Sequence, residues 1–155
     1  MDQIRDLDAI FVLGPSSSGK TTLCDALSKR LGIKPPLYIK EVARKVMVTH
    51  GFTRNDVDKY EMQYAIMAAQ LEAERAARKH ITPAYMGEAG ARSALLLSDR
   101  SAIDPIVYAT ASLAPGADER RQRLIEDGEL QAILPWYRQG LFGKYCLITS
   151  PVRLT

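Results

Sequence analysis

The sequence lacks the features that mark several large classes of protein. Two cysteines in 155 residues are too few for the disulfide framework of a small secreted domain. Lys and Arg number 21 against 18 for Asp and Glu, so no strongly basic surface for nucleic acid is expected. Purely apolar runs such as residues 9–13 are far too short to cross a membrane. Since the N-terminus is polar and acidic rather than an export leader, we expect a cytoplasmic protein with no membrane span and no nucleic-acid partner.

The residues that are present are typical of one soluble globular domain. The composition is 46% hydrophobic and 25% charged, which excludes a disordered or low-complexity chain. A chain of 155 residues can bury a core without help from disulfides or metals. Because neither an internal repeat nor a linker divides the sequence, residues 1–155 are predicted to form a single domain.

Strand-like and helix-like segments alternate along the chain. Short apolar runs predict strands at residues 9–13, 37–39, 94–97 and 145–149. Amphipathic segments predict helices at residues 22–31 and 42–49, from residue 55 or 56 to residue 80, and near residues 105–112, 118–127 and 129–139. A loop is predicted at residues 81–92. This alternation predicts a three-layer α/β fold, in which helices cover both faces of a mostly parallel sheet.

The longest predicted helix has one apolar face. Its apolar residues recur at intervals of three and four: Val57, Tyr60, Tyr64, Met67 and Leu71. Beyond Leu71 the segment becomes charged, and we expect that end of the helix to project into water. Gln63 and Gln70 lie seven residues apart on one side of the helix, where decoration of the helix edge is expected and contact with an acceptor base is the alternative.

The glycine-rich segment after the first predicted strand carries the strongest signal in the sequence. Residues 14–21 read Gly-Pro-Ser-Ser-Ser-Gly-Lys-Thr, which matches the phosphate-binding loop G-x-x-x-x-G-K-[ST] between a strand and a helix. The two glycines permit a backbone whose N–H groups turn toward an anion, and the helix adds its positive end. The lysine is expected to reach the β- and γ-phosphates, and the threonine hydroxyl to bind Mg²⁺. The predicted nucleotide-binding residues are Gly14, Pro15, Ser16, Ser17, Ser18, Gly19, Lys20, Thr21 and Thr22.

An acidic residue follows the third predicted strand. Asp99 precedes Arg100 and Ser101, and the carboxyl ends of parallel strands meet at the crevice where phosphates bind. Asp99 is therefore expected to hold a metal-bound water or to accept a proton, with capping of the next helix as the alternative. A hydrolytic motor typically places a second acid next, where this chain has Arg100. Guanine-selective switch proteins carry an Asn-Lys-x-Asp segment that this sequence lacks, so both hydrolase classes are disfavoured.

Several short segments together resemble one family of phosphate-binding-loop proteins. Asp99-Arg100-Ser101 resembles the Asp/Glu-Arg-[Ser/Tyr] motif of nucleoside and nucleotide kinases. Glu41 and Arg44 resemble the Glu-x-x-Arg of the ribosylnicotinamide kinase domain of NadR. With the phosphate-binding loop, these segments are similar to the AAA-domain family that contains this kinase, across roughly residues 9–149. The resemblance implies a P-loop NTPase fold of the nucleoside and nucleotide kinase type.

The resemblance also implies an activity: transfer of the γ-phosphoryl group of ATP to a hydroxyl of a small nucleoside-like acceptor, with Mg²⁺. The implied catalytic residues are Lys20, Glu41, Asp99 and Arg100, and the implied metal ligands are Thr21 and Asp99. Either Glu41 or Asp99 would orient or deprotonate the acceptor hydroxyl while the other assists with Mg²⁺. Arg44 and Arg100 would bind acceptor or phosphate oxygens, and Asp104 would hold a ribose hydroxyl.

Each of these residues also has a purely structural alternative. Glu41 can stabilise the first turn of a helix through the helix dipole. Arg44 and Arg100 can simply pair with Glu41 and Asp99. Asp104 precedes a proline, and such an Asp-Pro pair is typical of a helix start.

The sequence departs from the resemblance at its C-terminal end. It stops at residues 151–155, just past the fourth predicted strand, where kinases of this type continue into an arginine-bearing lid and a further strand and helix. The lid and last strand are therefore expected to be missing, through truncation or through loss. Because lid closure excludes water during phosphoryl transfer, two other functions stay open. They are a nucleotide-binding regulatory or lipid-associated module without kinase activity, and an NTP hydrolase.

Overall fold

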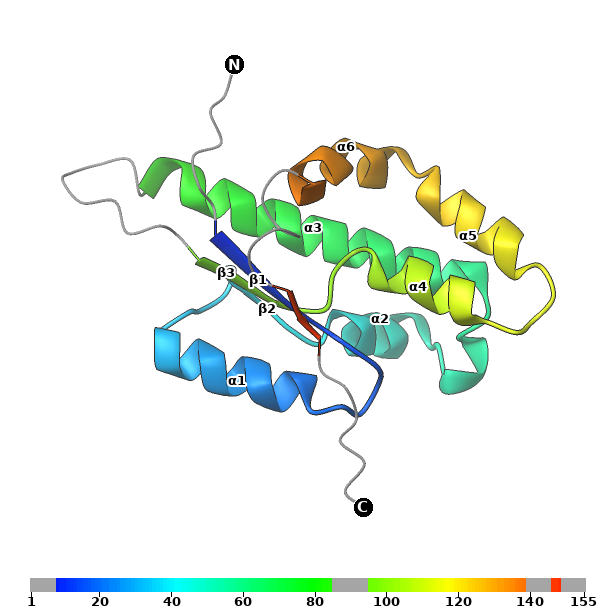
Figure 1. The fold of residues 1–155 in the computed structure, drawn as a ribbon, viewed down its shortest axis with the longest axis horizontal. Coiled ribbons are helices and arrows are strands. Elements are labelled where there is room, and N and C mark those ends of the chain that lie inside the picture. The colour runs from blue at the N-terminus through cyan, green and yellow to red at the C-terminus, as the bar shows by residue number, and fades with distance from the viewer. Residues whose placement is uncertain (1–7, 85–94, 139–145, 149–155) are drawn as a thin grey trace.

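The computed structural model of the chain describes residues 8–84, 95–138 and 146–148, which fold around a parallel sheet (Figure 1). Its strands are β1 (Asp8–Leu13), β2 (Tyr38–Ile39), β3 (Leu95–Asp99) and β4 (Cys146–Ile148). They pair in the order β2-β3-β1-β4, and every pairing is parallel. The strand that precedes the phosphate-binding loop, β1, is therefore a direct neighbour of the strand that ends in Asp99.

Helices cover both faces of this sheet. They are α1 (Lys20–Leu31), α2 (Val42–His50), α3 (Tyr60–Ala84), α4 (Asp104–Ala111), α5 (Ala117–Ile125) and α6 (Gly128–Trp136), with a 3-10 turn η1 (Arg54–Asp56) before α3. In Figure 1, α1 lies on one side of the strands and α3 and α6 on the other. This arrangement confirms the predicted three-layer α/β fold, which is that of a P-loop NTPase. Among the described residues, no helix is both long and apolar enough to cross a membrane.

β1 is apolar on both faces because each face packs on a different helical layer. Val12 belongs to a buried cluster with Cys24 of α1, whereas Phe11 belongs to a second cluster with Met67 of α3. The Phe11 ring meets the ring of Tyr137 edge-on, with 5.8 Å between their centroids. The alternation of side chains along the strand thus joins the two layers into one core.

Several helices begin or end at other residues than predicted. α1 begins at Lys20 rather than at residue 22, because the last residues of the phosphate-binding loop already form the first helical turn. The start predicted at residue 55 or 56 is the separate turn η1, closed by a capping box between Thr53 and Asp56. The long helix itself, α3, begins at Tyr60 and continues past residue 80 into part of the predicted 81–92 loop.

β3 continues two residues beyond the predicted end of its strand, so that Asp99 is its last residue. α6 ends at Trp136 and residues 137–138 continue it as a π-helical turn, close to the predicted end. The predictions for residues 85–92, 94, 139, 145 and 149, and those for the chain end at 151–155, lie outside the described residues.

Three polar residues of α3 are buried, contrary to the prediction, whereas Glu72 and Lys79 of its charged end are exposed as expected. Gln63, Gln70 and Glu74 have exposed fractions of 3%, 2% and 0%, whereas Tyr64 of the predicted apolar stripe is 40% exposed. Gln70 and Glu74 are paired with polar groups of other elements, which is what permits their burial. The expectations that the glutamines decorate a helix edge and that the charged end projects into water are therefore wrong for these three residues.

Candidate functional site

A pocket of about 940 Å³ lies at the carboxyl ends of the strands. Segments that follow three strands line it: residues 16–22 after β1, residues 41–44 after β2, and residues 99–101 at the end of β3. Side chains of α2, α3 and α4 complete its wall. This edge of a parallel sheet is where α/β folds bind their ligands.

The phosphate-binding loop connects β1 to α1 through an unusual backbone. Gly14, Ser17 and Gly19 have φ values of 151°, 60° and 81°. Glycine adopts such angles readily, whereas a residue with a side chain is destabilised by about 1–2 kcal/mol. No side chain caps the first turn of α1, so its backbone N–H groups and positive dipole end form a ready anion-binding site.

Lys20 places its charge inside this loop. The side chain is buried, and its Nζ donates to the Pro15 carbonyl and, over 3.2 Å, to the Ser18 hydroxyl. Burial lowers the pKa of the Lys20 ammonium, and the nearby Arg100 guanidinium lowers it further. The ammonium is thus a poorly solvated positive group beside a second cation, an arrangement that a polyphosphate would stabilise.

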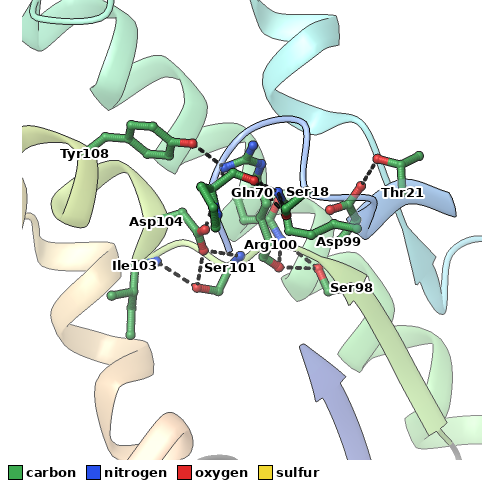
Figure 2. Close-up of polar contacts among 12 residues, drawn as sticks. Ser18, Thr21, Gln70, Ser98, Asp99, Arg100, Ser101, Ile103, Asp104 and Tyr108 are labelled. Carbon is green, nitrogen blue, oxygen red and sulfur yellow. Dashed lines mark hydrogen bonds and ion pairs between the residues drawn. The ribbon is translucent and has the colours of Figure 1, made fainter. Parts of the chain in front are cut away.

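Thr21 and Asp99 meet across the loop. The Thr21 hydroxyl donates to Asp99 Oδ2 over 2.6 Å (Figure 2). Register explains the contact, because Asp99 lies opposite Val12 at the end of β1. The other carboxylate oxygen, Asp99 Oδ1, is buried and has no hydrogen-bond partner within residues 8–84, 95–138 and 146–148.

The Thr21 hydroxyl and the Asp99 carboxylate fit a magnesium ion whose other ligands are phosphate and water oxygens. A buried carboxylate oxygen without a partner is unfavourable, and a cation would relieve it. Among the described residues no group of three or more His, Cys, Asp or Glu could form an all-protein metal cage. Mg²⁺ does not need one, since it keeps several waters and takes one or two carboxylates along with phosphate oxygens.

Arg100 turns from the tip of β3 toward α4. Its backbone is left-handed, with a φ of 80°. Its Nη1 donates to the Tyr108 hydroxyl over 3.0 Å and lies 3.8 Å from Asp104 Oδ1 (Figure 2). Arg100 therefore pairs with Asp104. The structural alternative, in which Arg100 pairs with Asp99, is wrong.

Asp104 closes the turn that leads into α4. Its Oδ2 accepts from the Ser101 backbone N–H over 2.7 Å and from the Ser101 hydroxyl over 2.8 Å. Burial raises the pKa of Asp104, and the bonds from Ser101 oppose that rise. The carboxylate thus stabilises the helix start, and its other oxygen faces Arg100.

Glu41 and Arg44 line the pocket from the segment that follows β2. Glu41 has a left-handed backbone, with a φ of 55°, directly before α2. Arg44 Nη1 donates to Glu41 Oε1 over 2.8 Å, and the arginine side chain is 77% exposed. The two residues therefore pair, as the structural alternative supposes, while both line the pocket.

The structure brings most of the predicted site residues to this one pocket. Lining it are Ser16, Ser17, Ser18, Gly19, Lys20, Thr21, Thr22, Glu41, Arg44, Asp99, Arg100 and Asp104. Gly14 and Pro15 are not among the lining residues, although the Pro15 carbonyl accepts from Lys20. Within the described ranges, the non-glycine residues with positive φ are Ser17, Glu41 and Arg100, and all of them line the pocket. Backbone strain of this kind typically gathers at functional sites.

The sequence analysis missed one lining residue, Tyr108, and assigned two others, Gln63 and Gln70, to a helix edge. Tyr108 lies four residues after Asp104 and hence on the same face of α4, a spacing that could have revealed it. Gln63 and Gln70 line the pocket from α3, and their spacing of seven residues was the available signal. Most of the other lining residues are apolar, among them Val42, Met47, Phe52, Met62 and Ile66, and Arg54 adds a positive charge.

Comparison with known proteins gives one positive result. A family model described as an AAA domain matches residues 9–134, more than half of the chain. The matched range includes the phosphate-binding loop, Asp99 and the whole lining of the pocket. No curated protein and no solved structure matches the chain significantly.

Proposed function

We propose that this chain, which belongs to the AAA domain family, is a small-molecule kinase that transfers the γ-phosphoryl group of ATP to a hydroxyl of a nucleoside-like acceptor with the help of Mg²⁺. The P-loop domain itself indicates nucleotide binding. The observation that carries the finer proposal is the pocket, which continues from the phosphate-binding loop to an apolar wall on α2 and α3. A hydrolase needs room only for a nucleotide and a water, whereas this pocket has a second end.

At the phosphate end, the loop N–H groups and Lys20 bind the β- and γ-phosphates. Thr21 and Asp99 are the residues that would hold Mg²⁺, which when bound neutralises phosphate charge. Arg100 lies at the junction of the two ends, close enough to Lys20 to lower its pKa. It is therefore suited to stabilise the charge that spreads over the transferred group.

At the acceptor end, the apolar side chains of α2 and α3 contact the body of the acceptor. Its hydroxyl lies toward Glu41 or Asp99, either of which takes the proton as the oxygen–phosphorus bond forms and the bond to the β-phosphate oxygen breaks. Arg44 and Asp104 contact the acceptor's polar groups. The similarity of Glu41 and Arg44 to the Glu-x-x-Arg of the NadR kinase domain supports a nucleoside-like acceptor.

Production of ADP from Mg²⁺-ATP, with and without a panel of nucleosides, tests the proposal. We expect ADP to form only with an acceptor, and a phosphorylated acceptor to appear in equal amount. A Lys20→Ala variant run beside the wild type identifies activity from contaminating enzymes. ADP release at the same rate without any acceptor would mean an NTP hydrolase, and nucleotide binding with no turnover would mean a regulatory module.

A further inference from the structure

A buried polar network runs from the pocket-lining residue Gln70 to Glu74 and to the backbone of Arg100. Its centre is Glu74 of α3, whose side chain has no exposed surface. The Glu74 carboxylate accepts from the Tyr137 hydroxyl and from Gln70 Nε2 over 3.0 Å. These donors come from two different parts of the chain, the end of α6 and α3 itself.

The network reaches the backbone of Arg100 through two hydrogen bonds in series. Gln70 Nε2 donates to the Ser98 hydroxyl over 3.0 Å, and that hydroxyl donates to the Arg100 carbonyl over 2.7 Å. Gln70 Nε2 also lies 3.4 Å from the same carbonyl. Figure 2 shows Gln70 and Ser98 beside Arg100. The carbonyl held in this way belongs to the residue with the left-handed backbone.

The direction of these bonds depends on the charge of Glu74. A carboxylate can only accept, so it obliges Gln70 to present its NH₂ group. The second hydrogen of that group then occupies the Ser98 oxygen, which leaves the Ser98 hydroxyl hydrogen for the Arg100 carbonyl. A neutral group at position 74 can donate, which allows the Gln70 amide to turn over. The Gln70 oxygen would then face Ser98 and accept the Ser98 hydroxyl hydrogen. The Arg100 carbonyl would lose that hydrogen bond.

We infer that Glu74 is a positioning residue for Arg100: as a carboxylate it sets the orientation of Gln70, and through Ser98 it holds the backbone from which the Arg100 guanidinium reaches the pocket. The inference rests on the proposed function for the importance of Arg100, but the hydrogen-bond chain itself does not depend on it.

Protonation of Glu74 provides a way to test this series of hydrogen bonds. Burial raises the pKa of Glu74 to about 7, opposed by the bonds from Tyr137 and Gln70 and by the charge of Arg78. Among the described residues, the charged and titratable groups facing Glu74 are Arg78 on α3 and Tyr137 beyond α6, while β3 and the turn before α4 present Ser98 and the Ala102 N–H. Acidification through neutral pH is therefore expected to act as a Glu74→Gln substitution does.

The test follows the Arg100 side chain directly, by the ¹⁵Nε resonance of the full chain, assigned by its loss in Arg100→Lys. We expect Glu74→Gln and Ser98→Ala to displace this resonance alike, and the double variant to displace it no further, because both substitutions cut one chain of bonds. In the wild type the resonance moves with a midpoint near pH 7 and in Glu74→Gln it does not. Tyr137→Phe raises the midpoint, since the Tyr137 hydroxyl lowers the pKa of Glu74.

Kinetics supply the second readout. We expect Glu74→Gln to reduce kcat about 10- to 100-fold, as small misplacements of a reacting group do, with little change in the affinity for ATP. Glu72→Gln is the matched control, because Glu72 lies on the same helix with its side chain 68% exposed, and it should change neither readout. If Glu74→Gln does not fold, Ser98→Ala tests the same chain.

An unmoved Arg100 resonance in folded Glu74→Gln or Ser98→Ala would overturn the inference, and so would displacements that add in the double variant. If the wild type transfers no phosphate while the resonance behaves as expected, the proposed function fails and the positioning role stands.

Discussion

The phosphate end of the pocket and the surroundings of Arg100 are built in different ways. The phosphate end consists of one continuous segment, residues 14–22, together with Asp99 from another strand. The surroundings of Arg100 are assembled from β3, α3, α4 and Tyr137, which are distant in sequence. A continuous site is broken by changing a residue that touches the ligand. An assembled site is also broken by changing a residue that touches only its neighbours.

The largest expected effect is at the phosphate end. Lys20→Ala should weaken ATP binding about 1,000-fold, since it removes a buried charge aimed at the phosphates. The free energy of unfolding should not fall, because burial disfavours the Lys20 charge in the protein without nucleotide. Calorimetric titration measures the affinity, and Lys29→Ala, an exposed position on the same helix, is the control. Unchanged affinity in folded Lys20→Ala would remove the phosphate site from this end.

The next largest effect concerns the stability of the buried network around Arg100. Glu74 has a pKa of about 7 in the folded protein against an ordinary value of 4.5, a difference that corresponds to roughly 3 kcal/mol. Because the folded pKa is the higher one, this contribution is present below pH 4.5 and is lost as the pH rises to about 7. Urea unfolding at pH 4.5 and pH 8 should show the loss in the wild type, relative to Glu74→Gln. Equal pH dependence in both proteins would contradict the burial of an ionisable carboxyl group here.

The same contrast explains what could be predicted from the sequence. The phosphate-binding loop, the strands and the parallel sheet were predicted, because each depends on neighbouring residues and on periodicity within a short segment. Gln70 and Glu74 were assigned to a solvated surface, because polar side chains on a helix are exposed unless a distant partner satisfies them. Their spacing from Met67, at three and seven residues, matched the buried face, but the hydroxyls of Ser98 and Tyr137 that permit this burial appear only in the fold.

A smaller effect should separate the acceptor end from the phosphate end. Phe52→Ala removes part of the apolar wall, and we expect the KM for the acceptor to rise about tenfold, while the affinity for ATP stays the same. Steady-state kinetics with the acceptor varied measure the first and calorimetry the second. Leu113→Ala, fully exposed and outside the pocket lining, is the control. A parallel loss of ATP affinity would mean that the two ends are not separate.

The smallest effect is expected at the Glu41–Arg44 pair. Arg44 is largely exposed, and exposed ion pairs contribute less than about 1 kcal/mol to stability. Arg44→Ala should therefore leave the thermal midpoint of unfolding almost unchanged. Because we propose that Arg44 contacts the acceptor, its loss should raise the KM for the acceptor several-fold. A variant that loses stability and keeps its KM would make the pair purely structural.

The most direct test of the site is a calorimetric titration of ATP, with and without Mg²⁺, into the wild type and Asp99→Asn. The substitution retains a side-chain oxygen for the Thr21 hydroxyl and removes the carboxylate charge. Mg²⁺ should tighten ATP binding to the wild type about tenfold or more and have little effect on Asp99→Asn. An equal gain from Mg²⁺ in both proteins would contradict a metal-nucleotide site formed by the phosphate-binding loop and the tip of β3.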